Sequence, residues 1–233
     1  MDCMEWIMGY GNAVRQSLPG TQLRNFAVVL LGSVLAIPAL AQISDNQIWN
    51  ELASGNRRFM NGKPERRDLV ARRKELEKTQ SPRVAVLSCA DSRVPPEVVF
   101  DESLGDLFVV RSAGESADPL AVGSLEYAVE HLGTVVIVVM GHQSCGAVKA
   151  ACSGEKPASQ NLDAVVTPIA ASCTKVDKSK PDTFDLAGRD HVHSVALELL
   201  AKSVILKKAA DEGMLTIVEA YYSLDTGEVT KLR

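Results

Sequence analysis

The 233-residue chain has little net charge of either sign. It carries 25 lysines and arginines against 29 aspartates and glutamates, a formal net charge of −4, and the two signs are interspersed. Binding to a nucleic-acid backbone needs a concentrated positive surface, so the composition argues against that class of protein. The densest basic cluster, residues 57–74, also contains Glu65 and Asp68, which is typical of a solvated helix face. The sequence has no internal repeat and no low-complexity tract, which excludes repeat architectures.

Long hydrophobic runs are also missing. The longest apolar stretch, Phe26–Ile37, has about a dozen residues, fewer than the roughly 18–20 that span a bilayer. Arg24 precedes this stretch and Ala39-Leu40-Ala41 follows it, which is the order of a secretory signal peptide with its cleavage signal. We therefore expect export to the periplasm, cleavage after Ala41, a mature start at Gln42 and no stable membrane association afterwards. An uncleaved membrane anchor is the alternative.

Cysteine is scarce, with five residues in the chain. Cys3 would leave with the signal peptide, and Cys89 and Cys145 lie in the two motifs described below. Cys152 and Cys173 remain. In an oxidising compartment they could form a disulfide, but buried unpaired thiols fit the sequence equally well, and the question stays open at this point.

The remaining residues, 42–233, predict one α/β domain, since 46% of the chain is hydrophobic and this length supports a single large core. Apolar, β-branched runs predict strands at 84–88, 107–111, 134–140, 214–222 and 228–232. Helical periodicity predicts helices at about 48–59, 65–78, 118–132 and 144–151, and another that Asp190 caps. Alternating strands and helices favour a doubly wound fold, with a central, mainly parallel β-sheet flanked by helices. Residues 153–185 are the least readable, since they are polar and contain three prolines.

Two short motifs carry the chemistry. Cys89-Ala90-Asp91-Ser92-Arg93 and Gly141-His142-Gln143-Ser144-Cys145-Gly146 each follow a predicted strand. Parallel strands would bring both motifs to the carboxyl edge of the sheet, where α/β folds place their sites. Two thiolates and an imidazole are the donors of a zinc site with one exchangeable position. Each motif alone is weak, but the combination indicates zinc-activated water and hence a hydration or hydrolysis reaction.

The segments CADSRVPPEVVFDESLGDLFVVRSAG, LEYAVEHLG and VVMGHQSCGAVKAA resemble the β-class carbonic anhydrases. The resemblance runs from about Trp49 to Leu232 and weakens over residues 153–185. It implies a β-carbonic anhydrase-like fold and the reversible hydration of CO₂ to bicarbonate and a proton by zinc-bound hydroxide. It also implies one Zn²⁺ per subunit, held by Cys89, His142 and Cys145.

The same resemblance implies a catalytic dyad of Asp91 and Arg93 beside the metal. In an open form, Asp91 would accept a hydrogen bond from the water or hydroxide, and in a closed form Asp91 would itself become the fourth zinc ligand. Arg93 has a physical role in either form, because a fixed cation keeps the carboxylate ionised and turned away from the metal.

Three further positions match substrate-contacting residues of the family. Gln80 corresponds to a glutamine that bonds substrate, although a solvated loop residue is its ordinary interpretation. Phe108 and Tyr127 match aromatic residues that line a CO₂ pocket across a dimer interface, or they are simply core residues. The resemblance thus implies a homodimer or homotetramer. Glu115 stands where many relatives carry asparagine, and the sequence assigns it no role.

Two rival functions remain. One is a CS₂ or COS hydrolase on the same scaffold, which an assay of both gases would separate from a carbonic anhydrase. The other is a non-catalytic zinc-binding or assembly protein. The Asp91–Arg93 pair argues against the second, because a purely structural zinc site more often has four protein ligands.

Overall fold

The structure is a computed structural model that describes residues 45–177 and 179–233. The chain divides into two units, Met1–Ala41 and Gln42–Arg233, and all described residues belong to the second. The expected signal peptide, residues 1–41, and the expected start at Gln42 lie outside the described residues and stay predictions. Within the two described ranges, no helix is both long and apolar enough to cross a membrane.

A single sheet forms the centre of the described chain. Its strands are β1 (Val84–Cys89), β2 (Leu107–Ser112), β3 (Val136–His142), β4 (Thr216–Tyr222) and β5 (Val229–Lys231). They lie in the order β2-β1-β3-β4-β5, and all neighbours are parallel except β4 and β5. Every residue of β1 and β3 is buried, while β2 is an edge strand with no fully buried residue. The predicted α/β fold with a mainly parallel sheet is confirmed.

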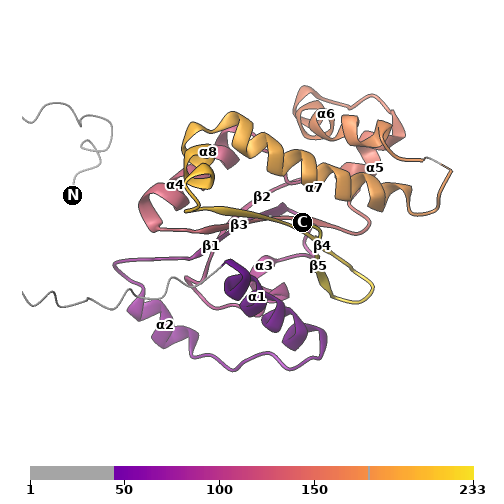
Figure 1. Ribbon diagram of the computed structural model, residues 1–233. Coiled ribbons are helices and arrows are strands. Elements are labelled where there is room, and N and C mark those ends of the chain that lie inside the picture. The colour runs from indigo at the N-terminus through magenta and orange to yellow at the C-terminus, as the bar shows by residue number, and fades with distance from the viewer. Residues whose placement is uncertain (1–44, 178) are drawn as a thin grey trace, which may run out of the picture. The chain divides into compact units, whose positions relative to one another are not determined.

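Helices cover both faces of this sheet (Figure 1). On one side lie α4 (Pro119–Leu132), α7 (Thr183–Lys202) and α8 (Val204–Asp211), and on the other lie α1 (Asp45–Met60), α2 (Leu69–Glu75) and α3 (Pro96–Val99). Alternate strand residues point to opposite faces, so the sheet contributes side chains to an apolar core on each face. One core contains Leu87 and Val139, and the other contains Val86 and Val138.

Local signals set the ends of α4 as the sequence predicts. The Asp118 carboxylate accepts hydrogen bonds from the Leu120 and Ala121 amides, and Pro119 occupies the first helical turn. Gly133 ends the helix with φ 75°, a left-handed conformation that glycine adopts at little cost.

The prediction that Asp190 caps a helix is wrong. The helix α7 begins seven residues earlier at Thr183, and Asp190 lies within it. Its carboxylate instead accepts a 2.9 Å bond from Lys175 Nζ, so it joins α7 to the end of the preceding helix. An aspartate on a helix surface and one at a helix start look alike in sequence, and only the tertiary partner distinguishes them.

Residues 153–185, which the sequence left unassigned, contain the second helix of a helix hairpin. Helices α5 (Gly146–Ser153) and α6 (Gln160–Thr174) pack against each other, and a disulfide joins Cys152 to Cys173. This settles the open question of these two cysteines. The hairpin follows directly from the second motif, so the disulfide anchors a segment that begins one residue after Cys145.

Candidate metal centre

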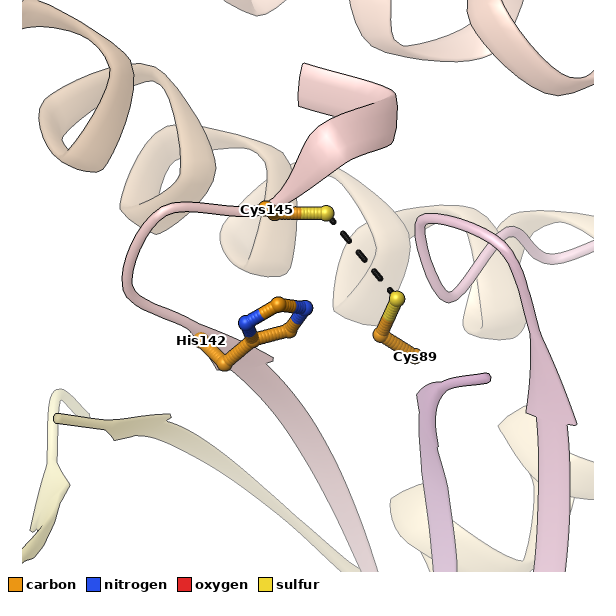
Figure 2. Close-up of side chains that lie close together, drawn as sticks. All are labelled: Cys89, His142 and Cys145. Carbon is orange, nitrogen blue, oxygen red and sulfur yellow. Dashed lines mark hydrogen bonds between the residues drawn. The ribbon is translucent and has the colours of Figure 1, made fainter. Parts of the chain in front are cut away.

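The two motifs meet at the carboxyl edge of the sheet. Cys89 is the last residue of β1, His142 the last of the neighbouring parallel strand β3, and Cys145 the residue that precedes α5. Their side chains converge (Figure 2), with the two sulfur atoms 3.9 Å apart and all three donor atoms within 4.8 Å of one another. The three residues are 5%, 2% and 4% exposed, so the cluster is buried.

The hydrogen bonding of His142 leaves one ring nitrogen available. Nδ1 lies 2.9 Å from the Gln143 carbonyl oxygen, which can only accept, so Nδ1 carries the hydrogen. Nε2 is buried and has no hydrogen-bond partner among the described residues. A buried lone pair without a partner is costly, and a metal ion is the partner that this tautomer favours.

The donor set and its spacing fit zinc. Two thiolates at about 2.3 Å from a tetrahedral zinc ion lie about 3.8 Å apart, and the observed sulfur separation is 3.9 Å. Soft sulfur donors with one imidazole select zinc over magnesium or calcium. Three protein donors leave one coordination position for an exchangeable ligand, which is the pattern of a catalytic site.

The two thiols influence each other strongly. The hydrogen bond from Cys145 lowers the pKa of Cys89, while the same contact raises the pKa of Cys145. The Gly114 amide also donates to Cys89 Sγ at 3.4 Å. Two thiolates this close repel each other, so a dication between them is what allows both to ionise.

Asp91 and Arg93 form a forked ion pair beside the cluster. Arg93 Nε lies 2.9 Å from Asp91 Oδ1, Arg93 Nη2 lies 2.7 Å from Oδ2, and the Arg93 amide donates to Oδ1 at 3.0 Å. The Arg93 hydrogen bonds hold the pKa of Asp91 well below its usual range. Oδ2 is also 3.9 Å from His142 Nε2. An ionised acceptor therefore faces the donor cluster.

The three expected substrate residues lie together, but away from the donor cluster of the same chain. Phe108 and Tyr127 have ring centroids 6.3 Å apart, and Tyr127 and Gln80 line one cavity of about 560 Å³. Phe108 pairs with Ala85, four residues before Cys89 on β1. Four strand residues span about 13 Å, so these side chains belong to the opposite end of the strands.

Several residues near the cluster gave no sequence signal for a role there. The Asp185 carboxylate accepts from the Ser144 amide at 2.9 Å, within the turn that joins two of the donors. Glu115 is 1% exposed with φ 32°, and burial followed by the charge of Cys89 raises its pKa well above the ordinary value. The sequence could not show these contacts, because they depend on packing between segments far apart in the chain. The positive φ of Glu115 is backbone strain of the kind found at functional sites.

Comparison with known proteins gives a consistent result. The family profile described as carbonic anhydrase matches residues 84–229. Carbonic anhydrase 2 of Mycobacterium tuberculosis is 40% identical over 186 residues, which cover 77% of this chain and 88% of that protein.

Solved structures agree with this match. The Coccomyxa β-carbonic anhydrase in complex with acetazolamide is 27% identical, with a TM-score of 0.62 and coverage of 80% of this chain and 82% of that one. A tetrameric β-carbonic anhydrase of Sordaria macrospora shares the fold at 21% identity and a TM-score of 0.61, covering 80% of this chain and 92% of that one. The chain therefore belongs to the β-carbonic anhydrase family, with zinc as its metal and CO₂ as its substrate.

Proposed function

We propose that this chain catalyses the reversible hydration of CO₂ to bicarbonate and a proton at the Cys89–His142–Cys145 site. One observation carries the proposal: a buried three-donor cluster, with an unpartnered imidazole nitrogen, faces a carboxylate that an arginine holds ionised. Bound at these three residues, zinc would lower the pKa of a bound water molecule, an effect best documented in the carbonic anhydrases with three histidine ligands.

The residues around the cluster have separate tasks. Asp91 Oδ2 accepts a hydrogen bond from the attacking water and so orients a lone pair of that water toward CO₂. Arg93 keeps Asp91 ionised and occupies both carboxylate oxygens, which holds the side chain away from the three donors. A closed form, with Asp91 as a fourth ligand, requires this ion pair to break. Arg93 is half exposed, so the pair can open to solvent.

Hydration measured by stopped flow on purified mature protein tests this function, together with its zinc content. Cys89→Ala, His142→Ala and Cys145→Ala should each lose most of the zinc and essentially all activity, whereas Lys208→Ala, at an exposed lysine of α8, should change neither. Zinc-loaded wild-type protein that fails to hydrate CO₂ but hydrolyses CS₂ or COS would establish the rival activity. Absence of all three activities would leave a zinc-binding assembly protein.

The position of Gln80, Phe108 and Tyr127 supports a homodimer or homotetramer. Phe108 lies on β2, an edge strand whose apolar residues are only partly buried in one chain. A second copy packed along this edge would bring the three side chains of one subunit to the donor cluster of the other. The Sordaria macrospora relatives are described as tetrameric. Light scattering on the purified protein should give the mass of two or four subunits, and a monomer mass with full activity would contradict this assembly.

Export to the periplasm is supported by two independent features. The first is the signal-peptide pattern that ends in Ala39-Leu40-Ala41. The second is the Cys152–Cys173 disulfide, since such bonds persist mainly in oxidising compartments. Tagged protein should fractionate with the periplasm, and mass spectrometry should find Gln42 at its N-terminus. An intact chain in membrane pellets would indicate an anchor, and an intact soluble chain in the cytosol would contradict export.

A further inference from the structure

A single residue, Gly114, connects a metal donor to a buried histidine. The Gly114 amide donates to Cys89 Sγ at 3.4 Å, and the Gly114 carbonyl accepts from His191 Nε2 at 2.8 Å. His191 lies on α7 and is fully buried, at 0% exposure. The path from the imidazole to the sulfur therefore consists of two hydrogen bonds and the backbone of one glycine.

The hydrogen bond to the Gly114 carbonyl determines which ring nitrogen of His191 carries the hydrogen. A carbonyl oxygen can only accept, so Nε2 carries the hydrogen and Nδ1 carries the lone pair. Nδ1 is buried and has no hydrogen-bond partner in the part of the chain that is described. Burial lowers the pKa of His191, which agrees with a neutral ring. A ring with no exposed surface suits the role of a fixed donor better than that of a proton carrier to solvent.

The backbone around Gly114 needs an external anchor. Gly114 has φ 74°, a conformation that side chains disfavour, and a Cβ atom there would lie 2.6 Å from Ile169 Cδ1. The next residue, Glu115, also has a positive φ of 32°. Two successive residues in a conformation that side chains disfavour do not hold their peptide planes unaided. The bond from His191 to the Gly114 carbonyl, at 2.8 Å, is shorter than the one from Ser116 Oγ, at 3.4 Å.

Helix α7 anchors the second donor loop as well. The Asp185 carboxylate, in its first turn, accepts from the amide of Ser144, a residue with φ 57° between His142 and Cys145. The same helix thus bonds both to the loop after β2 that contacts Cys89 and to the turn that carries Cys145. Residues around a metal site that orient its ligands are a general feature of metalloproteins, and substituting them typically costs 10–100-fold in affinity or activity.

We propose that His191 is a positioning residue of the metal centre. Its Nε2–H fixes the Gly114 carbonyl and with it the backbone conformation of Gly114, so that the Gly114 N–H stays on the sulfur of Cys89. A hydrogen bond to a thiolate withdraws electron density from the sulfur and so makes the bound metal a stronger Lewis acid. The inference rests on the metal site and activity proposed above, but its main readouts are binding and spectroscopy, which do not require catalysis.

The test compares His191→Gln with His191→Asn in the full protein. The glutamine amide nitrogen reaches the place of Nε2, whereas the shorter asparagine does not, and both variants bury a similar polar amide. His191→Asn should bind zinc about 10–100-fold more weakly in a chelator competition, and should shift the sulfur-to-cobalt charge-transfer band of the cobalt-loaded protein. The midpoint of its pH–activity curve should move to higher pH. His191→Gln should stay close to wild type in all three measurements.

The matched control is His193→Gln, on the same helix, where His193 Nδ1 contacts Glu219 at 2.8 Å and, in the described part of the chain, has no hydrogen bond to Gly114 or Ser144. It should leave zinc affinity and the cobalt band unchanged. Equal zinc affinity and equal cobalt spectra in His191→Asn and His191→Gln would overturn the proposal, whatever the thermal stability of the two variants. Wild-type protein that binds zinc but does not hydrate CO₂ would instead contradict the proposed function and leave the binding comparison intact.

Discussion

Single residues determine how the ion pair beside the metal centre responds to pH. Arg93 hydrogen bonds hold the pKa of Asp91 below its ordinary range. In Arg93→Ala that pKa should rise and the carboxylate should be free to turn toward the donors. The pH–activity profile should then move to higher pH, because the Asp91 carboxylate would compete with water for the exchangeable coordination position. Stopped-flow hydration across pH measures this, and an unchanged profile would show that Arg93 does not gate the site.

Two companion variants sharpen that test. Arg93→Lys keeps the positive charge but loses the planar fork that bonds both oxygens, so its profile should lie between wild type and Arg93→Ala. Asp91→Ala should retain zinc yet lose much of its activity, because the acceptor for the attacking water is gone.

Glu102 offers a prediction about stability rather than catalysis. Burial, and next the charge of Asp106, raise the pKa of Glu102 to about 7. A carboxyl whose pKa is raised by folding binds more protons in the folded state, so its contribution to stability is present below the unfolded pKa and is lost as pH rises through 7. Glu102→Gln should therefore match wild type near pH 4 and unfold at a higher temperature than wild type near pH 8. A stability difference that does not grow with pH would contradict this.

At the scale of elements, the disulfide between α5 and α6 makes the clearest contribution. Cys152 and Cys173 are 21 residues apart in sequence, and closing a loop of that size stabilises a fold by about 3 kcal/mol in the chain-entropy model. Urea unfolding of the reduced protein should show a loss of that order. The Cys152→Ala/Cys173→Ala variant should show the same loss and no response to reductant. Identical unfolding curves with and without reductant in wild type would show that the bond is not stabilising.

The strands and helices also differ in how far the sequence could predict them. The strands that lead to the two motifs were predictable, because buried parallel strands appear as continuous apolar, β-branched runs. The helix α6 was not, since it contains Pro168 and lies in a polar segment. The start of α7 was also missed, because Asp190 resembles a helix cap but pairs with Lys175.

The metal donors were predictable for a related reason. Cys89 and His142 end readable strands and Cys145 precedes a readable helix, so local patterns indicated these three candidate donors. The contacts of Gly114 and Asp185 with the donor loops join segments far apart in the chain, and no local pattern reports them. The pairing of Cys152 with Cys173 is of the same kind, since spacing alone left it open.

At the scale of the whole molecule, the three metal donors and the expected substrate residues lie far apart within one chain, although catalysis should bring them together. The donors lie at the carboxyl ends of β1 and β3, whereas Phe108 lies near the start of β2 and Gln80 lies before β1. The distance along the strands is about 13 Å or more. The proposed assembly of two subunits would resolve this separation, because the expected substrate residues of one subunit would face the donors of the other.

Subunit complementation tests this assembly directly. His142→Ala removes the metal site of its own subunit, and the double variant Gln80→Ala/Tyr127→Ala removes the substrate residues; each protein alone should be nearly inactive. In a hybrid dimer, intact donors from one subunit meet intact substrate residues from the other, so one of the two sites is restored. Mixing and refolding the two proteins in equal amounts should recover roughly a quarter of wild-type activity, since half of the dimers are hybrids with one working site. Activity that stays at the level of the separate variants, with hybrids verified by native mass spectrometry, would show that each subunit contains its complete site.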